Sequence, residues 1–227
     1  MRKYYEAYDD RYHQVHALNL QWFDDSPSPI VYKTIEKLKV SIKDAILELG
    51  CGEGRDAIFL LRNGYTVTAT DVSPNAIQYC QSKFPDFEEN FRCLDCVDGE
   101  FEVSYKFIYA IAVLHMLVDS CDRFAFYRFI YQHLTNDGYA LICSMGDGNI
   151  QYKTDTAAAF DLQERIHDQT GKALNVAATS CCIVNFTRFS DEIVSSSLDI
   201  VEAGLTDTVP GFNQMMYAIV RRHQKGA

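Results

Sequence analysis

The middle of the chain alternates between two hydrophobic periods. Five segments are predicted as strands, because their apolar residues run together or occupy every second position. These segments are 45–49, 65–71, 91–95, 105–114 and 139–145. Between them, apolar residues recur three or four positions apart, which places them on one face of a helix. This alternation predicts an α/β fold with a parallel sheet of right-handed βαβ units.

Short polar signals mark the ends of several elements. Ser28-Pro29 and Ser73-Pro74 each place a capping hydroxyl before a proline, which is the preferred order at a helix start. Asn63-Gly64 supplies a glycine for the left-handed end of a helix. The sequence Asn136-Asp137-Gly138 predicts a turn before the strand at 139–145.

The C-terminal part has a different pattern. Helical spacing predicts a last helix that begins at Phe189 and ends at Gly204, with Val194, Leu198 and Val201 among its inward residues. Two strands should follow, at 205–209 and 215–222. Their short connection predicts an antiparallel hairpin.

Residues 146–186 interrupt the strand–helix rhythm. Two glycines follow the strand tip at Met145, and a helix is predicted over 156–169. An insertion here would lie over the carboxyl ends of the neighbouring strands, where open α/β sheets bind their ligands. We therefore expect a lid over a second ligand, or else an ordinary surface excursion. Its candidate inner face consists of Phe160, Leu162, Ile166 and Phe186.

A glycine loop follows the first strand and organises the rest of the chain. The strand residues 45–49 lead into Gly50, Gly52 and Gly54 at alternate positions. Glycine has no side chain, so a ligand can lie directly on this backbone. The next strand ends at Asp71, about 20 residues after the first glycine, where a carboxylate can accept hydrogen bonds from ribose hydroxyls.

The glycine spacing separates two cofactor classes. A dinucleotide fingerprint requires G-x-G-x-x-G, but here Arg55 occupies the third glycine position. The sequence E-L-G-C-G-E-G, followed by an aspartate at the end of the second strand, resembles motifs I and II of class I S-adenosylmethionine (SAM) dependent methyltransferases. The segment ending at His115 and the turn before the fifth strand are similar to later motifs of that family.

The resemblance implies a Rossmann-like, seven-stranded, mostly parallel sheet with helices on both faces and a terminal antiparallel hairpin. It also implies a role for particular residues. Glu48, Gly50, Cys51 and Gly52 would contact the methionine and ribose side of SAM. Asp71 would accept from both ribose hydroxyls, Val72 would flank the adenine, and Asp95 and Cys96 would lie beside the adenine amino group. Ala112 would lie under the sulfonium, and His115 would contact the cofactor.

The N-terminal segment is rich in aromatic residues. Tyr4, Tyr8 and Tyr12 are spaced four apart and line one face of a predicted helix. Trp22 is the only tryptophan in the chain. The segment either packs on the domain or covers the ligand, and in the second case Trp22 would touch the cofactor.

The acceptor side carries only two candidates for chemistry. Asp147 follows a strand tip at the edge where ligands bind, and His115 follows another. Either could serve as a base toward a protonated acceptor. Each also has a simpler interpretation, Asp147 as a turn residue between glycines and His115 as a strand-end residue without chemistry.

Composition limits the possible partners and location. A net charge of −10 argues against nucleic acid as a partner, because phosphate binding needs lysine and arginine. No apolar run approaches the length that spans a bilayer, and no hydrophobic region follows the N-terminal basic pair. Eight cysteines without a secretory signal indicate reduced thiols in a cytoplasm. Cys93 and Cys96 form one CxxC pair, too few ligands to predict a metal site.

The leading hypothesis is a cytoplasmic SAM-dependent methyltransferase with a small-molecule acceptor that carries a sulfur, nitrogen, oxygen or chalcogen nucleophile. The aromatic N-terminus resembles the tellurite-resistance and thiopurine types. One domain would comprise a helical cap (1–43), a SAM-binding core (44–145), a lid-like insertion (146–186) and a final helix with a hairpin (187–227). The alternatives are a non-catalytic SAM-binding sensor or partner subunit, and a nicotinamide oxidoreductase.

Overall fold

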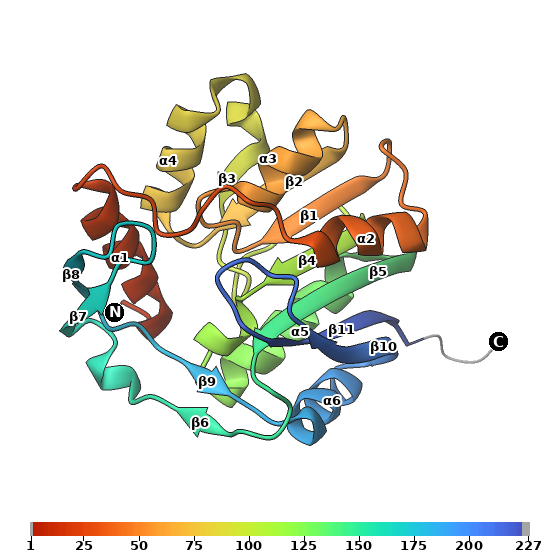
Figure 1. Ribbon diagram of the computed structural model, residues 1–227. Coiled ribbons are helices and arrows are strands. Elements are labelled where there is room, and N and C mark those ends of the chain that lie inside the picture. Colours follow the sequence, from red (N-terminus) through yellow and green to blue (C-terminus); the bar gives the residue numbers. More distant parts are fainter. Residues whose placement is uncertain (1, 224–227) are drawn as a thin grey trace.

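The centre of the molecule is a seven-stranded sheet with the strand order β10-β11-β5-β4-β1-β2-β3. The computed structural model describes residues 2–223 (Figure 1). The strands are β1 (Ala45–Leu49), β2 (Thr66–Asp71), β3 (Phe91–Cys93), β4 (Tyr105–Ile111), β5 (Leu134–Met145), β10 (Leu198–Thr206) and β11 (Met215–Arg222). The first five are parallel, and β11 is antiparallel to both β5 and β10. The predicted fold class is confirmed.

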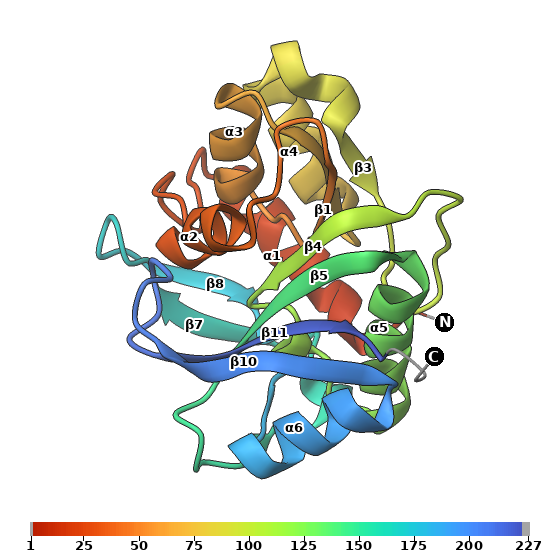
Figure 2. The same ribbon diagram turned by 90° about the vertical axis from the view of Figure 1, so that its right-hand side faces the viewer.

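Helices cover both faces of the sheet, as Figures 1 and 2 show. Their bounds are α2 (Pro29–Leu38), α3 (Arg55–Arg62), α4 (Pro74–Lys83), α5 (Ser120–His133) and α6 (Phe186–Ser195). On one face Ile46 of β1 packs in a core with α2, α3 and α4, and on the other face Leu47 packs with α5 and α6. Strand side chains alternate between faces, so each strand supplies apolar residues to both cores.

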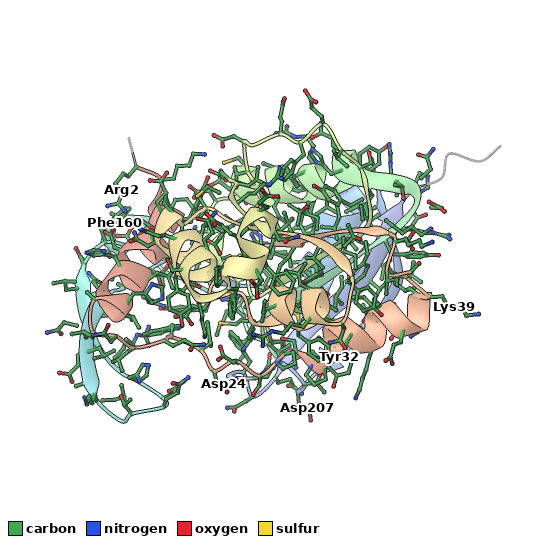
Figure 3. The ribbon with its side chains drawn as sticks, turned by 90° about the horizontal axis from the view of Figure 1, so that it is seen from above. Arg2, Asp24, Tyr32, Lys39, Phe160 and Asp207 are labelled. Atoms are coloured by element: carbon green, nitrogen blue, oxygen red, sulfur yellow. The ribbon has the colours of Figure 1, made fainter. Side chains whose placement is uncertain are left out.

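The N-terminal helix lies beside the insertion, away from the sheet. A 3-10 turn, η1 (Tyr4–Glu6), leads into α1 (Ala7–His16), which packs along β8 and α4. The insertion contains η4 (Thr156–Ala158) and two small antiparallel pairs: β6 (Tyr152–Lys153) with β9 (Cys182–Ile183), and β7 (Leu162–Ile166) with β8 (Ala173–Ala177). Figure 3 shows Arg2 beside Phe160, whose ring lies 4.4 Å from the guanidinium carbon. Within residues 2–223 no helix combines the length and apolar character that crossing a membrane requires.

The predicted helix over 156–169 is wrong. Most of this segment is the short turn η4 and the strand β7. Leu162 and Ile166 are four residues apart, a spacing that fits one face of a strand as well as one face of a helix. Leu162 is 66% exposed and lines no described cavity, so its predicted inward position is wrong, whereas Ile166, although 60% exposed, does line the large cavity described below.

The predicted helix over 189–204 is correct only in its first part. Helix α6 ends at Ser195, and Ser197 has a left-handed φ of 62° that turns the chain. Residues 198–206 instead form β10, where Gly204 pairs with Tyr217. Antiparallel pairing with β11 satisfies the backbone of this segment. Val194 and Val201 are therefore exposed rather than inward, while the predicted hairpin is confirmed with a longer first strand.

The predicted turn at 136–138 lies inside β5. Pairing with β4 jumps from Tyr105–Leu134 to Phe107–Tyr139, so the turn residues form a bulge in a continuous strand. The strand then runs through the core to Met145. Its tip therefore still reaches the edge of the sheet where the strand at 139–145 was expected to end.

A buried ion pair joins α5 to α6 below this edge. The side chain of Arg123 is fully buried, and its Nη2 donates to Oε2 of Glu192 at 2.6 Å. The Nη1 atom of Arg123 donates to the carbonyl oxygens of Leu114 and Leu117 at 2.9 and 3.3 Å. The pair thus also fixes η3 (Leu114–Met116), the turn that follows β4.

We predict that Glu192→Gln lowers the free energy of unfolding by about 3–5 kcal/mol, because it leaves the buried Arg123 guanidinium without its counter-charge. Urea denaturation followed by circular dichroism measures this loss. The control is Asp137→Asn, which removes a carboxylate that is 80% exposed and paired with Lys106, and should leave stability nearly unchanged because solvent screens exposed pairs. Equal effects of the two substitutions would contradict this account of the buried pair.

Candidate active site

The glycine loop between β1 and α3 is in close contact with its neighbours. Gly50, Gly52 and Gly54 have φ values of 70°, 51° and 82°, which side chains other than glycine rarely adopt. A Cβ on Gly50 would lie 2.3 Å from Cγ2 of Val113, and a Cβ on Gly52 would lie 2.5 Å from the Tyr12 hydroxyl. A side chain at either of these two positions would therefore be strained and would force its neighbour to move.

Asp71 faces the loop from the end of β2. Its Oδ2 accepts from the backbone N–H of Gly52 at 2.8 Å, and its Oδ1 accepts from the backbone N–H of Ser73 at 2.9 Å. Burial raises the pKa of Asp71 to about 6. Each carboxylate oxygen has a second lone pair that these backbone donors leave available, as binding to ribose hydroxyls requires.

One side-chain oxygen of Glu48 has no hydrogen-bond donor. Its side chain is 3% exposed, and its Oε2 atom accepts no hydrogen bond from residues 2–223. Burial raises the pKa of Glu48, and the charge of Asp56 adds to that effect. Glu48 lines a cavity of about 50 Å³ together with Gly50, Cys51 and Ala112. An orphaned carboxylate at this place fits a cationic partner such as an ammonium group.

Asp95 lies beyond β3 and is bonded to the N-terminal segment. Its Oδ1 accepts from the N–H of Val97 at 2.8 Å, while its Oδ2 accepts from Nζ of Lys3 at 2.7 Å and from the Tyr5 hydroxyl at 2.9 Å. A cavity of about 60 Å³ beside it is also lined by Val72 and other residues. The predicted residues Val72, Asp95 and Cys96 thus lie together, with Tyr5, Tyr8 and Tyr12 opposite them.

A much larger cavity, of about 480 Å³, opens on the other side of the glycine loop. Its wall combines the tips of β4 and β5, the N-terminal segment, the insertion and the loop between β10 and β11. Ala112, Met116 and Phe212 line both this cavity and the one beside Glu48. The two spaces therefore share a wall.

Two predicted residues lie in the large cavity rather than beside the loop. Trp22 lines only the large cavity, on the side of the N-terminal segment. His115 is 4% exposed, and the backbone N–H of Met145 donates to its Nδ1 at 3.5 Å, which leaves the proton of a neutral imidazole on Nε2. Burial and the nearby charge of Arg123 lower the pKa of His115 to about 3. Its imidazole is therefore neutral near pH 7 and a weak base.

Asp147 does not line any of these three cavities. Its Oδ1 accepts from the N–H groups of Asn149 and Ile150 at 2.8 and 2.9 Å, and these bonds lower its pKa. The carboxylate thus holds its own loop in a turn. The structure does not bring Asp147 and His115 together in one site.

Ala112 has an unusual backbone conformation at the wall between the two cavities. Its φ is 61°, which is uncommon for residues with a side chain, and its N–H donates to the carbonyl oxygen of Cys143 on β5. Such conformations often occur at functional sites, where surrounding contacts enforce them. The strand β4 therefore ends abruptly where its tip meets both cavities.

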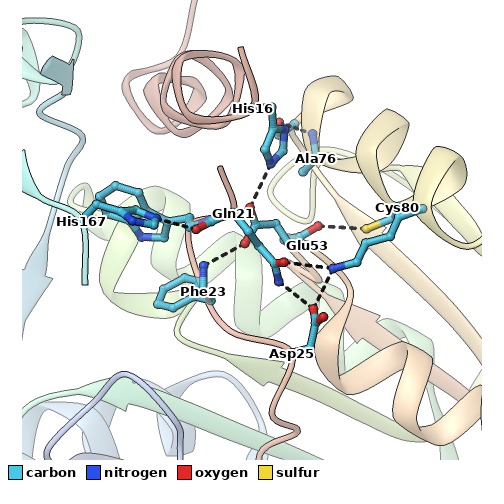
Figure 4. A network of polar contacts seen from close by, with 12 residues as sticks. His16, Gln21, Phe23, Asp25, Glu53, Ala76, Cys80 and His167 are labelled. Atoms are coloured by element: carbon cyan, nitrogen blue, oxygen red, sulfur yellow. Dashed lines mark hydrogen bonds and ion pairs between the residues drawn. The ribbon is translucent and has the colours of Figure 1, made fainter. Parts of the chain in front are cut away.

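Glu53 attaches the N-terminal segment to the glycine loop (Figure 4). Its Oε1 accepts from the N–H of Trp22 at 2.7 Å and contacts Nε2 of His16 at 2.9 Å, and its Oε2 accepts from the N–H of Phe23 at 2.9 Å. The residue is 4% exposed. Sequence reasoning missed this role, although a glutamate within an otherwise buried glycine loop was a signal that a partner must satisfy it.

Comparison with known proteins finds a family match in the central part of the chain. Residues 46–138 match a family model described as a methyltransferase domain. A 2-heptyl-1-hydroxyquinolin-4(1H)-one methyltransferase of Mycobacteroides abscessus is 39% identical over 57 residues, which are 25% of this chain and 24% of that protein. A malonyl-[acyl-carrier protein] O-methyltransferase of Acetivibrio thermocellus is 30% identical over 76 residues, 33% of this chain and 27% of that protein. The match thus spans less than a third of either relative.

A solved structure is similar over nearly the whole chain. It is the 1,6-didemethyltoxoflavin-N1-methyltransferase of Burkholderia thailandensis with bound 1,6-didemethyltoxoflavin and S-adenosylhomocysteine. The TM-score is 0.69 at 15% identity, and the alignment covers 97% of this chain and 89% of that one. At this identity the likeness establishes the fold, including the presence of elements outside residues 46–138.

We predict that Glu53→Ala exposes the amides of Trp22 and Phe23, because both lose their charged acceptor. Hydrogen bonds to charged groups contribute about 1.5–3 kcal/mol, so amide exchange at these two positions should accelerate at least about tenfold. Hydrogen exchange with mass spectrometry measures this. Glu36→Ala, which alters an exposed glutamate on α2, is the control. Unchanged exchange at residues 22–23 would contradict an anchoring role.

Proposed function

We propose that this chain, whose residues 46–138 form a class I SAM-dependent methyltransferase domain, transfers a methyl group from SAM to a small-molecule acceptor. The family model supports the predicted family over residues 46–138, and that family implies SAM as the cofactor. The narrower likeness to tellurite-resistance and thiopurine enzymes stays a prediction. So does a cytoplasmic location, which eight unpaired thiols support.

The observation that carries the proposal is the shared wall between two unlike spaces. On one side lie the glycine loop, Asp71 and Glu48, which suit a nucleoside with a cationic end. On the other side lies a cavity of about 480 Å³, within the usual range for small-molecule sites. Ala112 and Met116 line both spaces, so a methyl group presented there would face an acceptor directly.

The predicted cofactor residues would contact SAM in the following order. Glu48 would accept from the ammonium group of its methionine part, and Asp71 would accept from the ribose hydroxyls. Val72, Asp95 and Cys96 would hold the adenine. SAM lying on Gly52 would take the place of the Tyr12 hydroxyl, so Tyr12 must shift when SAM binds.

SAM supplies a methyl group that is already activated by its sulfonium, so the protein has mainly to position the acceptor. Holding reactants in line can lower a barrier by about 7–11 kcal/mol. The cavity wall provides apolar surfaces for this, including Trp22, Phe23 and Phe212. His115 lines the cavity and has a proton on Nε2 to donate, but its lowered pKa makes it a poor general base.

Two relatives support a small acceptor. The Mycobacteroides enzyme is named for a hydroxyquinolone, and the Burkholderia structure contains a small heterocycle. Side chains from four parts of the chain line the large cavity around a space of compact-molecule size. A protein tail or a nucleic acid would need a longer groove.

We predict that SAM affinity rises as the pH increases from about 5 to 7, with a midpoint near the Asp71 pKa of about 6. The ribose hydroxyls donate to ionised Asp71, so protonation removes an acceptor and weakens binding. Asp71→Asn should bind SAM at least about tenfold more weakly at neutral pH, and without this pH dependence. Calorimetric titration across pH measures both. A wild-type affinity that does not change over this range would remove Asp71 from the site.

Turnover tests the function itself. The purified chain is incubated with SAM and a panel of small thiols, phenols, amines and acids, and S-adenosylhomocysteine is quantified. We expect product with at least one acceptor class, and calorimetric binding of SAM but not of NADH. A protein that binds SAM yet produces no S-adenosylhomocysteine with any acceptor would favour the sensor alternative.

A further inference from the structure

A buried arginine lines the large cavity. Arg11 of α1 is 9% exposed, and its guanidinium is held by the insertion. The Nη2 atom donates to the carbonyl oxygens of Ala177 and Ala178 at 2.9 and 2.8 Å, and to Oγ1 of Thr179 at 2.7 Å. Its Nε also donates to Ala177 at 3.3 Å. These contacts fix the orientation of the guanidinium.

This cation has no counter-charge in the part of the chain that the structure describes. No carboxylate of residues 2–223 lies within 4 Å of Arg11, and its Nη1 atom makes no hydrogen bond with them. The rings of Trp22 and Tyr8 lie 4.8 and 5.2 Å from the guanidinium carbon. Arginine does not lose its proton in proteins, so a buried positive charge remains on the cavity wall. Buried charges are normally paired.

The remaining charged residues do not cancel it. Arg165 and Asp168 also line the cavity, and both are exposed. His167 is hydrogen-bonded at both ring nitrogens, to the carbonyl oxygen of Gln21 and to Thr170. Two arginines against one aspartate leave the wall positive, in a chain whose net charge is −10. The positive wall would attract an anion, whereas the net negative charge of the whole chain would repel one.

The buried titratable groups of the cavity are poor bases at neutral pH, and the other two candidates are the exposed carboxylate of Asp168 and His167, whose ring nitrogens are both hydrogen-bonded. The pKa of His115 is lowered to about 3, and burial raises the pKa of the Cys181 thiol to about 11. Burial likewise raises the pKa of Tyr8. These buried groups would not act as an effective general base for an acceptor that must lose a proton during the reaction. An acceptor that arrives ionised needs none.

We propose that Arg11 selects an acceptor that is an organic oxyanion, a carboxylate, phenolate or enolate, whose charge is held at Nη1 within the large cavity. This inference rests on the proposed function. The guanidinium is fixed by the insertion through Nε and Nη2, so the N–H groups of Nη1 remain to donate charge-assisted hydrogen bonds to an oxyanion. If that oxyanion is itself the nucleophile, its electron pair forms the bond to the methyl carbon and the carbon–sulfur pair goes to sulfur, so no proton has to move.

Trp22 provides the readout, because it is the only tryptophan, lines the cavity and stacks near Arg11. Benzoate and benzamide are the probes, since they share shape and differ in charge. Their dissociation constants are measured from Trp22 fluorescence at pH 7.5 with S-adenosylhomocysteine present. We expect wild-type protein to bind benzoate at least about tenfold more tightly than benzamide, the ratio that about 1.4 kcal/mol produces. Arg11→Gln should lower this ratio to near one.

Three further variants define the outcome. Arg11→Lys keeps the charge and should retain part of the preference, which guards against loss of folding in Arg11→Gln. Arg165→Gln removes an exposed charge and should change the ratio less than about twofold. Arg62→Gln, on the far side of the glycine loop on α3, controls for net charge. Each variant is first checked by circular dichroism and thermal melting.

The inference is overturned if wild-type protein does not prefer benzoate, if neither probe binds at millimolar concentration, or if Arg11→Gln keeps the preference. Calorimetry with SAM separates this result from the proposed function. Arg11 lines neither cavity beside the glycine loop, so SAM binding should survive Arg11→Gln. If wild-type protein itself does not bind SAM in calorimetry, that result contradicts the proposed function.

Discussion

The carboxylate of Glu53 is buried in the glycine loop and stays paired only while residues 16–23 lie against it. A buried charge without donors is unfavourable, so the loop and the N-terminal segment stabilise each other. Earlier residues of the N-terminal segment are also hydrogen-bonded, to the start of α4 and to β8. Oδ1 of Asp9 accepts from Ser73 and Asn75 at the start of α4, and Gln14 accepts from the N–H of Ala177 on β8. The glycine loop, the N-terminal segment and the insertion therefore form one connected unit.

The sequence predicted the parts of this unit that follow from local rules. Most of the strands and helices over 45–145 were correct, because the central strands β1 and β4 are buried on both faces. Asp71 and the glycines could be placed because a strand–loop–helix unit fixes their geometry. The insertion could not, since the spacing of Leu162 and Ile166 fits helix and strand equally. Arg11 was missed for a related reason: its partners on the insertion are 166–168 residues away in sequence.

Burial acts in opposite ways on the two sides of the shared wall. Beside the loop, Glu48 and Asp71 are acids whose pKa values are raised by burial, so they gain from a ligand that brings donors or positive charge. In the large cavity, Arg11 stays cationic and His115 is kept neutral, with Arg123 contributing to that shift. SAM is cationic at its sulfonium, and the proposed acceptor is anionic. Each space thus carries the charge that complements its proposed ligand.

Tyr12 lines all three cavities, and its hydroxyl rests on Gly52. The ligand that binds first must fix the conformation of the Tyr12 ring. The second ligand then binds to a cavity wall whose conformation is already fixed. The entropic cost of ordering this ring therefore falls on the first binding event and not on the second. Cofactor and acceptor should therefore raise each other's affinity by the same factor, because a coupling free energy between two sites is reciprocal. A single tyrosine on the N-terminal helix would make the two binding equilibria interdependent.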